Sequence, residues 1–316
     1  MKIGVLTSGG DAPGMNACVR AVVRSAIHYG FEAYGVYDGY KGLVENKIRK
    51  LNHNDVGQIL NRGGTILGSS RLEAFKQKEV RQIAIDNLKS KDIDALVVIG
   101  GDGTYRGGMA LDEMGIKVIA IPGTIDNDIA STEYTIGFFT ALDTAIDAID
   151  KLRDTSFSHQ RCTVVEVMGR DCGDLSIYSG IATGAEIVIT KETGFNREDV
   201  INQAKRAQSM GKRHLIVVVA EHITNVFDLA KDIQKHAGYE SRATVLGYIQ
   251  RGGNPSAFDR ILASKMGVHA VELLKGGISG MAVFTKSLEI GHCPINEALE
   301  IKDEITDLYQ YLKKLN

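Results

Sequence analysis

Short runs of β-branched residues alternate with longer helical patterns along this chain. Three such pairs, each a strand and then a helix, are Ile3–Thr7 and Met15–Tyr29, Ala95–Ile99 and Tyr105–Met114, and Cys162–Val167 and Gly173–Ile181. A strand that is repeatedly followed by a helix is typical of a parallel sheet covered by helices. The alternation therefore predicts an α/β fold.

Further elements extend this pattern to most of the chain. The additional strands are Val118–Ile121, Glu186–Ile189, Leu215–Ala220 and Thr244–Ile249, and the additional helices are Asp199–Met210, Phe227–His236 and Phe258–Leu274. With 316 residues, 44% of them hydrophobic, the chain is long enough for two domains. We expect two doubly wound α/β domains with mainly parallel sheets, interleaved in the chain. The larger takes residues 1–137 plus 250–300, and the smaller takes 138–249 plus 301–316.

The composition argues against several classes of partner. A formal charge of −2 gives no general attraction to nucleic acid or to anionic membranes. No apolar run approaches the roughly 20 residues of a membrane-spanning helix, and the eight histidines show no HExxH spacing for zinc. The four cysteines form no CxxC pair and the N-terminus lacks a signal-peptide composition, so we expect a cytoplasmic protein.

Glycines gather where predicted strands give way to helices. They are Gly9, Gly10 and Gly14 at the first junction, Gly100, Gly101 and Gly103 at the second, and Gly123 at the third. Open parallel sheets bind ligands just beyond the strand ends, so one pocket could join all three junctions. The first, SGGDAPGMN, resembles a phosphate loop. However, Met15 and Asn16 stand where a Walker A loop requires Lys and Ser or Thr, and an ordinary tight turn is the alternative.

The second junction, GGDGT, favours metal-bound ATP as its ligand. It fails the dinucleotide fingerprint because Arg106 stands where the third small residue belongs. Asp102 would repel a bare pyrophosphate group but would hold Mg²⁺ that bridges nucleotide phosphates. NAD kinases and lipid kinases use similar strings, and a structural turn remains the other interpretation.

The third junction, PGTIDND, places two carboxylates two residues apart beside Thr124. Phosphoryl transfer needs a carboxylate that deprotonates the attacking hydroxyl and another that helps to organise the metal. We assign Asp126 as the base and Asp128 as its partner, although such residues are usually turn formers.

Several arginines at predicted element ends could supply positive charge for phosphate binding. They are Arg71, Arg161, Arg170, Arg242 and Arg251. Each one alone would be read as a surface cation. Glu221 ends an apolar run and could accept a hydrogen bond from a sugar hydroxyl.

Together, TSGGDAPGMN, GGDGT, PGTIDND, MGRDCGD and LGYIQRGGNPSAFDR closely resemble the ATP-dependent 6-phosphofructokinase family in order and spacing, over essentially the whole chain. The resemblance implies a glycolytic kinase that transfers the γ-phosphoryl group of ATP to the 1-hydroxyl of fructose 6-phosphate, with Mg²⁺. It also implies a homotetramer whose subunits share active sites.

The resemblance also implies roles for individual residues. MgATP would be held by Gly10, Arg71, Leu72, Gly101, Asp102, Gly103 and Thr104, with Asp102 as the metal-side carboxylate. Thr124, Arg71 and Arg161 would stabilise the transferring phosphoryl group. Fructose 6-phosphate would contact Thr124, Ile125, Asp126, Arg161, Met168, Gly169, Arg170, Glu221, Arg242, Tyr248 and Arg251, with Arg161 and Arg242 from a neighbouring subunit. Tyr248 stands where the family usually has a histidine, so we expect weaker 6-phosphate binding.

The family's effector site is matched only in part. The matching positions are Arg20, Arg24, Arg153, Gly184, Glu186, Lys212, Arg213 and His214. His53 and Met210 stand where arginines are usual, and Gln58 replaces an Asp. Because two fixed positive charges that could bond phosphate are reduced or lost, we expect blunted activation by ADP and blunted inhibition by phosphoenolpyruvate.

Individual residues of these motifs distinguish the expected function from competing ones. Pyrophosphate-using relatives carry Asp and Lys where this chain has Gly103 and Gly123, so ATP is expected as the donor. The MGRD and QRGG segments argue against an NAD or lipid kinase. A nucleotide-sensing subunit without activity would be expected to lose Asp102, Asp126 or Asp128, and all three are present.

Overall fold

The structure, a computed structural model, describes residues 1–300 and 308–315. The chain forms two compact units. The first comprises Met1–Ile125, Ile129–Thr140 and the described residues from Arg251 onward to residue 300, and the second comprises Asp126–Asp128, Ala141–Gln250 and the described residues 308–315. No described helix is long and apolar enough to span a bilayer.

The first unit is built on a seven-stranded sheet with the order β11-β10-β5-β4-β1-β2-β3. The strands are β1 (Lys2–Thr7), β2 (Glu32–Val36), β3 (Ile48–Leu51), β4 (Ala95–Gly100), β5 (Lys117–Pro122), β10 (Met281–Lys286) and β11 (Glu289–Pro294). All neighbouring pairs are parallel except the two edge pairs β2–β3 and β10–β11. The central strands β4 and β5 are almost entirely buried because helices cover both faces of the sheet.

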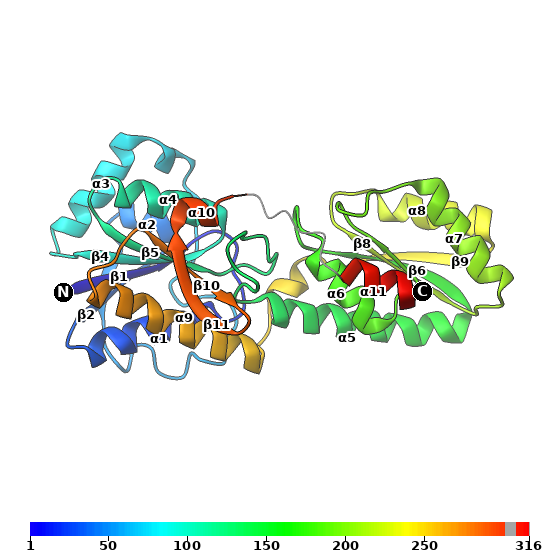
Figure 1. The fold of residues 1–316 in the computed structure, drawn as a ribbon, viewed down its shortest axis with the longest axis horizontal. Coiled ribbons are helices and arrows are strands. Elements are labelled where there is room, and N and C mark those ends of the chain that lie inside the picture. The colour runs from blue at the N-terminus through cyan, green and yellow to red at the C-terminus, as the bar shows by residue number, and fades with distance from the viewer. Residues whose placement is uncertain (301–307, 316) are drawn as a thin grey trace. The chain divides into compact units, whose positions relative to one another are not determined.

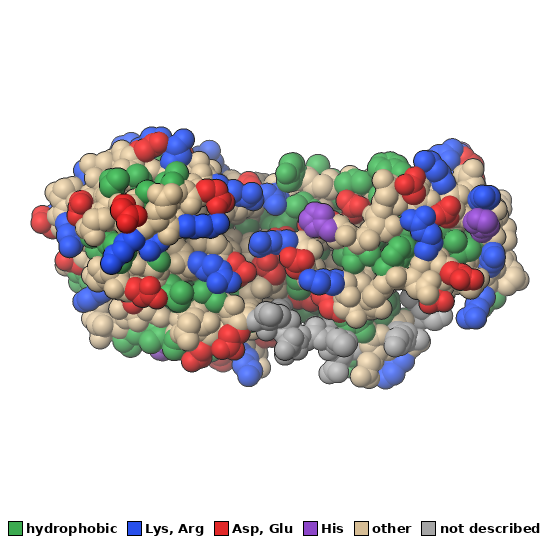
Figure 2. Space-filling model, turned by 90° about the horizontal axis from the view of Figure 1, so that it is seen from above, with side chains coloured by type: hydrophobic (Ala, Val, Ile, Leu, Met, Phe, Trp, Pro, Cys, Tyr) green, Lys and Arg blue, Asp and Glu red, His purple; other side chains and the backbone are tan. Residues whose placement is uncertain are grey.

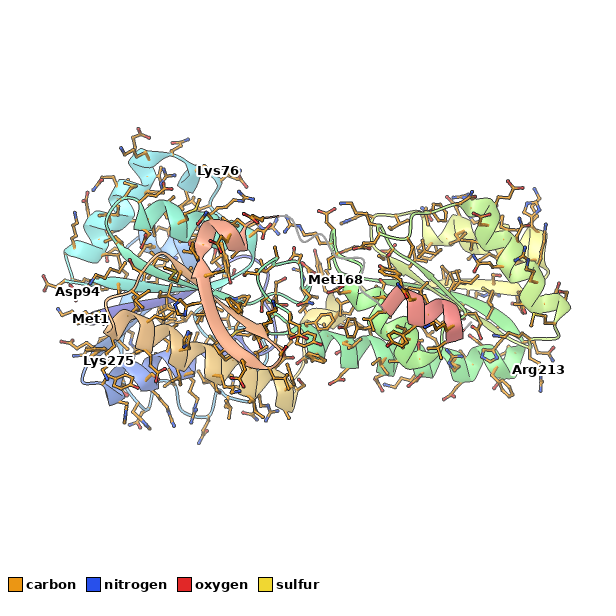
Figure 3. All side chains as sticks on the ribbon, viewed as in Figure 1. Met1, Lys76, Asp94, Met168, Arg213 and Lys275 are labelled. Atoms are coloured by element: carbon orange, nitrogen blue, oxygen red, sulfur yellow. The ribbon has the colours of Figure 1, made fainter. Side chains whose placement is uncertain are left out.

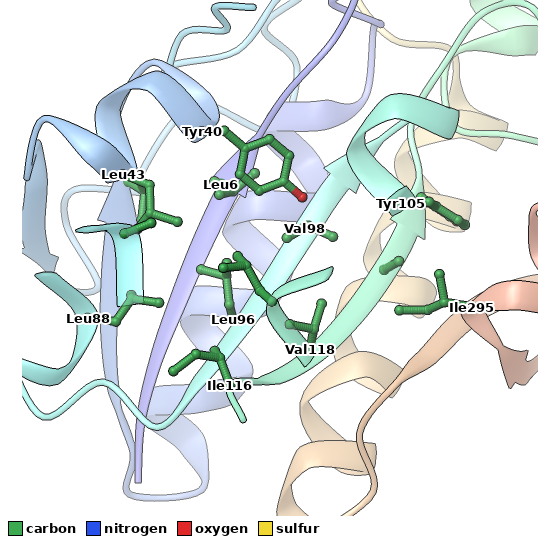
Figure 4. Packing of buried hydrophobic residues seen from close by; sticks show 14 of the residues in the cluster. Leu6, Tyr40, Leu43, Leu88, Leu96, Val98, Tyr105, Ile116, Val118 and Ile295 are labelled. Carbon is green, nitrogen blue, oxygen red and sulfur yellow. The ribbon is translucent and has the colours of Figure 1, made fainter. Parts of the chain in front are cut away.

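Helices of the first unit lie on both faces of this sheet (Figure 1). They are α1 (Met15–His28), α2 (Gly39–Val44), α3 (Lys78–Lys89), α4 (Asp102–Asp112), α9 (Ala257–Lys275), α10 (Ile295–Ala298) and the 3₁₀ turn η1 (Glu73–Lys76). Alternate strand residues such as Leu96, Val98 and Val118 pack against Leu43, Leu88 and Tyr105 from the helices of one face (Figure 4). Because successive side chains of a strand point to opposite faces of the sheet, the apolar residues of each strand contribute to a core on both faces.

The second unit is built on a four-stranded, all-parallel sheet with the order β7-β8-β6-β9. Its strands are β6 (Arg161–Val167), β7 (Ile187–Ile189), β8 (Leu215–Ala220) and β9 (Glu240–Val245). Its helices are α5 (Phe138–His159), α6 (Asp174–Thr183), α7 (Arg197–Ser209), α8 (Val226–Ala237), the 3₁₀ turn η2 (Gly247–Arg251) and α11 (Leu308–Leu315). Apolar residues of α7 and α8 form a core with β6, β7 and β8.

The predicted fold class of two α/β units with mainly parallel sheets, interleaved in the chain, is confirmed. The strand expected at Thr244–Ile249 is wrong, because β9 ends at Val245 and the chain turns at Gly247, whose φ is +57°. The sequence interpretation also missed the strands β2, β3, β10 and β11 and the helices α2, α3, α5, α10 and α11.

The unit boundaries differ from the predicted ones at three places within the described residues. One difference is a single residue, because Gln250 belongs to the second unit and not to the larger domain. The chain enters the second unit after Thr140 rather than after residue 137, because the Thr140 N–H donates to Asp259 of α9 at 2.8 Å. Residues 126–128 belong to the second unit, where Asn127 Nδ2 donates to Asp174 at 2.8 Å. Of the segment 301–316 assigned to the smaller domain, residues 301–307 and 316 lie outside the described residues.

Candidate active site

The three glycine-rich junctions meet at one edge of the seven-stranded sheet. β1, β4 and β5 are neighbours and parallel, so their carboxyl ends lie side by side. The Ser8 N–H donates to Ile99 O at 3.0 Å, and the Gly123 N–H donates to Gly100 O at 3.1 Å. These bonds tie the first junction to the second and the second to the third.

This close approach explains why Gly100 and Gly123 carry no side chain. A Cβ at Gly100 would stand 2.3 Å from Ser8 O, and a Cβ at Gly123 would stand 2.9 Å from Ile99 Cγ2. The Thr104 hydroxyl donates to Ser8 O at 3.0 Å, so the first turn of α4 is fixed to the first junction. The glycines thus allow the backbone to approach closely where the sequence predicted a ligand site.

Helix α4 begins at Asp102, with Gly101 as its N-cap. No side chain caps this end, and the Thr104 N–H donates to Gly101 O at 2.9 Å. The positive end of the helix dipole, at Asp102 and Gly103, favours an anion. Tyr40 donates to Thr104 O at 2.6 Å and steadies the first turn. At Gly103 a Cβ would meet no atom of the protein within 4 Å, so the space beside Asp102 is open.

A polar pocket opens beside the first junction. It is lined by Gly9, Gly10, Asp11, Thr65, Ser69, Arg71 and Arg251. Three of these residues, Gly10, Arg71 and Arg251, were predicted as binding residues. Leu72, also predicted, is the N-cap of η1 directly after Arg71. Two guanidinium groups and the glycine backbone make the pocket suited to phosphate.

Thr65, Ser69 and Asp11 line the pocket but were not singled out from the sequence. Asp11 lies within the SGGDAPGMN run, and Ser69 lies within the GSS run before Arg71. Their proximity to these motifs could have indicated that they line the pocket. Thr65 carries no such indication. It reaches the pocket because its hydroxyl lies 2.8 Å from the Thr7 hydroxyl at the end of β1.

The PGTIDND segment is held on both sides by side-chain bonds. In the first unit the Thr135 hydroxyl donates to Thr124 O at 2.6 Å, and Ile125 is buried. In the second unit Asn127 is 1% exposed and adopts φ of +54°. Asp126 and Asp128 each have one carboxylate oxygen shielded from solvent.

Asp128 also forms an ion pair within the second unit. Its Oδ2 lies 3.5 Å from a guanidinium nitrogen of Arg170. Arg170 belongs to the MGRD segment that follows β6. The structure therefore joins two predicted substrate segments, PGTIDND and MGRD.

The MGRD segment is shaped by Glu221, which follows β8. Glu221 Oε1 accepts from the Gly169 N–H at 3.1 Å and from the Arg170 N–H at 2.7 Å. Gly169 has φ of +142°, and a Cβ there would stand 2.5 Å from Cys172 O. Met168 is buried, and its N–H donates to Gln250 at 3.3 Å. This carboxylate thus fixes the turn of the predicted sugar-binding segment.

Arg161 and Arg242 do not join this segment. Arg161 is the first residue of β6, whereas Met168 follows its last residue. A seven-residue strand spans about 20 Å, so Arg161 lies at the opposite end of β6 from Met168. Arg242, which pairs with Thr163 of β6, lies nearer to that end. There both contact Glu240, at 3.0 Å from Arg161 and 2.5 Å from Arg242. Tyr248, also predicted as a substrate residue, is 77% exposed.

The second unit gathers most of the predicted effector residues into one cluster. Arg153 Nη1 lies 3.2 Å from His214 Nε2, Lys212 lies 3.4 Å from Glu186, and the Arg213 guanidinium stacks over Phe157 at 5.0 Å. Burial lowers the pKa of His214. Figure 3 labels Met168 and Arg213 at opposite ends of this unit.

Other parts of the predicted effector set lie elsewhere. Figure 2 shows one face of the molecule, on which Lys and Arg side chains are interspersed with Asp and Glu. Gly184, the C-cap of α6 with φ of +64°, adjoins the cluster, because it follows Thr183, whose carbonyl accepts a hydrogen bond from Arg153. Arg20 and Arg24 belong to α1 of the first unit. Met210 is 78% exposed, and His53 and Gln58 are exposed residues of the first unit.

The protein side chains fit a magnesium ion that is shared with a nucleotide. Within the described ranges no three His, Cys, Asp or Glu side chains cluster closely enough to hold a metal. At phosphoryl-transfer sites Mg²⁺ is usually bound by one or two carboxylates together with substrate phosphates and waters. Asp102, half-buried next to the open space at Gly103, is suited to this role.

A sequence profile described as Phosphofructokinase matches residues 2–274. The chain belongs to the phosphofructokinase family. It is 57% identical over 316 residues to the ATP-dependent 6-phosphofructokinase of Photobacterium profundum, and the match covers 99% of both chains. It is 56% identical, with the same coverage, to the enzyme of that name from Aliivibrio fischeri. These similarities confirm the predicted family and enzyme class.

Solved phosphofructokinase structures share the fold. The phosphofructokinase of Saccharomyces cerevisiae superposes with a TM-score of 0.89 at 34% identity, over 99% of this chain and 47% of the yeast chain. A pyrophosphate-dependent phosphofructokinase from Marinobacter aquaeolei superposes with a TM-score of 0.85 at 21% identity, over 100% of this chain and 91% of that one. At this lower identity the likeness shows the fold alone.

Proposed function

We propose that this phosphofructokinase transfers the γ-phosphoryl group of ATP to the 1-hydroxyl of fructose 6-phosphate. The products are ADP and fructose 1,6-bisphosphate. The observation that carries the proposal is the meeting of three glycine-rich junctions beside an arginine-lined pocket and an open helix N-terminus. Backbone amides, arginines and a carboxylate in one place supply what phosphoryl transfer requires, namely positioning and neutralisation of charge.

Asp126 acts as the general base in this proposal. It takes the proton of the sugar 1-hydroxyl as that oxygen bonds to the γ-phosphorus, while the bond from the γ-phosphorus to the β,γ-bridging oxygen breaks and ADP leaves. The Asn127 bond to Asp174 supports this role because it fixes the backbone next to the base. Asp128 is the second carboxylate and helps to organise the metal and the base.

The positive groups stabilise the transferring phosphoryl group. We assign this to Arg71, to the Thr124 hydroxyl and to Arg161 of a neighbouring subunit. Gly10, Leu72 and Gly101 to Thr104 hold the nucleotide. Mg²⁺, held at Asp102, would neutralise charge on the phosphate oxygens.

ATP rather than pyrophosphate is the proposed donor. The supporting observation is the open space at Gly103, where a side chain would occupy the volume that a nucleotide needs. Activity with MgATP and with Mg-pyrophosphate should be measured in the same coupled assay. Turnover with pyrophosphate alone would refute this assignment.

The sugar phosphate is bound by residues from more than one part of the site. We assign Thr124, Ile125, Met168, Gly169, Arg170, Glu221, Tyr248 and Arg251, with Arg161 and Arg242 from a neighbouring subunit. The supporting observation is that Arg161 and Arg242 lie toward the amino ends of β6 and β9, whereas Met168 follows the carboxyl end of β6. A homotetramer with shared sites, in the cytoplasm, follows as part of the proposal.

Shared sites can be tested with hybrid oligomers. Asp126→Asn and Arg242→Ala are expected to be inactive alone, because each removes one half of every site. Coexpressed in equal amounts, they should recover activity at about a quarter of the sites, since one site in four then combines an intact base with an intact arginine. No recovery in hybrids that are verified by mass would refute sharing.

The central test is the Asp126→Asn variant in a coupled assay with MgATP and fructose 6-phosphate. We expect kcat to fall by roughly 10³-fold or more, with ATP binding retained in calorimetry. Asp147→Asn, an exposed carboxylate on α5, is the matched control and should leave kcat unchanged. Unchanged turnover in Asp126→Asn would remove the mechanism, and turnover of NAD or a lipid in place of the sugar phosphate would remove the function.

Allosteric control belongs to the proposal in a weakened form. The cluster around Arg153 and His214 supports an anion site for ADP or phosphoenolpyruvate. The absence of arginine at positions 53 and 210 argues for weak binding. Strongly sigmoidal kinetics with tight effector binding would contradict this expectation.

A further inference from the structure

Residues 62–71 form a loop that carries three of the pocket-lining residues, Thr65, Ser69 and Arg71. The loop has no helix or strand of its own. Its conformation must therefore come from bonds to other segments. Since Arg71 is proposed to act on the transferring phosphoryl group, whatever fixes this loop also fixes a group in the reaction.

Asn16, in the first turn of α1, makes three hydrogen bonds to this loop. Its Oδ1 accepts from the Ile66 N–H at 2.7 Å, and its Nδ2 donates to Arg62 O at 3.0 Å and to Gly63 O at 3.2 Å. The side chain is 1% exposed. The amide thus uses its oxygen and both N–H groups on backbone of the loop.

The same loop contacts the segment that carries Arg251. A Cβ at Gly63 would stand 2.3 Å from Gly253 O, so the two backbones are in close contact. By holding Gly63, Asn16 also supports the position of the segment 251–253. The buried amide therefore bonds the loop at the point where it meets the segment of Arg251.

Other bonds reach the loop farther along. The Thr7 hydroxyl donates to Gly68 O at 2.8 Å, and the Ser69 hydroxyl donates to Gly9 O at 2.5 Å. These contacts hold the second half of the loop to the end of β1. In the first half, the Thr65 hydroxyl lies 2.8 Å from the Thr7 hydroxyl, and Asn16 makes the three bonds that hold this half to α1.

We propose that Asn16 is a positioning residue for phosphoryl transfer, which fixes the 62–71 loop so that Arg71 meets the transferring group. The inference rests on the proposed function. It gives a role to a residue that stands where a Walker A loop has Ser or Thr. In this chain the Asn16 side chain fixes the 62–71 loop, and that loop carries the positively charged Arg71.

The test compares Asn16→Ala with Asn87→Ala. Asn87, in α3 of the same unit, donates its Nδ2 to Leu43 O and Val44 O at 2.9 Å each, away from the pocket. Both variants lose buried or half-buried amide bonds, so both should lower the unfolding midpoint. Only Asn16→Ala should lower kcat, by about 10-fold to 100-fold, since a shift of about 1 Å in a positioned group costs that much. Asn87→Ala should keep kcat within about twofold.

A double-mutant cycle separates positioning from general destabilisation. In an Arg71→Ala background the Asn16→Ala change should lower kcat by less than about threefold, because the positioned group is already gone. A fall of the same size in both backgrounds, or an unchanged kcat in the single variant, would overturn the inference. If Asn16→Ala does not fold, Asn16→Asp, which keeps an acceptor for Ile66, replaces it under the same criteria.

A structural readout distinguishes failure of the inference from failure of the proposed function. Amide hydrogen exchange at Ile66 and in the peptide 62–71 should speed up at least tenfold in Asn16→Ala and remain unchanged in Asn87→Ala. If the wild type shows no transfer from ATP to fructose 6-phosphate, the proposed function has failed. Unchanged exchange in Asn16→Ala overturns the positioning role even if the enzyme is active.

Discussion

A carboxylate introduced at Gly103 should impair ATP use without harming the fold. Gly103 is the second residue of α4, and a Cβ there meets no protein atom within 4 Å. Replacing a glycine inside a helix favours the helix by up to about 1 kcal/mol. An acidic residue in the first turn also interacts favourably with the helix dipole. We therefore expect Gly103→Asp to be at least as stable as the wild type.

The effect on the nucleotide is opposite in sign. Two unit charges about 4 Å apart repel by about 4 kcal/mol at the effective dielectric constant of a protein surface. Position 103 is exposed, so solvent and salt reduce this to about 2 kcal/mol. Since about 1.4 kcal/mol corresponds to tenfold, kcat/KM for ATP should fall roughly thirtyfold.

Gly103→Asn is the matched control, because it has the same shape without the charge. The assay is coupled ADP release at saturating fructose 6-phosphate, at low and high salt. The loss in Gly103→Asp should exceed that in Gly103→Asn at low salt and should shrink as salt rises. Equal losses in both variants would show that bulk and not charge acts here, and an unchanged kcat/KM in Gly103→Asp would refute the placement of the nucleotide.

Three further predictions concern stability and control. Gly100→Ala should lower the free energy of unfolding by at least about 2 kcal/mol, because the new Cβ would stand 2.3 Å from Ser8 O; a wild-type urea midpoint would contradict this. Met210→Arg should strengthen ADP activation about tenfold if a charged hydrogen bond to phosphate is restored, as read from the fructose 6-phosphate half-saturation. Burial and the neighbouring His292 lower the pKa of His269 below 6.5, so the unfolded chain binds that proton more readily and stability is lost as pH falls below 6.5. His269→Gln should make the unfolding midpoint less dependent on pH in that range, by less than one proton, and an unchanged slope would exclude His269 as a source.

Much of the candidate site could be predicted because its residues follow strand ends directly. Gly100 to Thr104 follow β4, and Gly123 to Asp128 follow β5, so local sequence placed both at the same edge of a parallel sheet. The pocket residues on the 62–71 loop could not be placed this way. That loop lies more than 45 residues along the chain from Asn16, which holds it, and no local pattern records such a contact.

For Glu221 the sequence indicated the position in the sheet but not the hydrogen bonds to the backbone. Its place after β8 indicated a carboxylate at the edge of the sheet, and a sugar hydroxyl was the expected partner. In the structure its Oε1 accepts from the backbone of Gly169 and Arg170. Backbone amides of a distant loop leave no trace in the sequence around Glu221.

The sequence by itself determined the α/β alternation, the close-packed glycines and the family, because strand and helix periods and junction residues are local properties. Tertiary structure decided the edge pairs β2–β3 and β10–β11, which lack the strand-then-helix pattern, and the end of β9 at Val245, before the turn at Gly247. It also decided that Arg161 and Arg242 both contact Glu240, and that Asn16 holds the loop of Arg71. The physical reason is that strand order and long-range hydrogen bonds join residues whose separation in sequence carries no information about their distance in space.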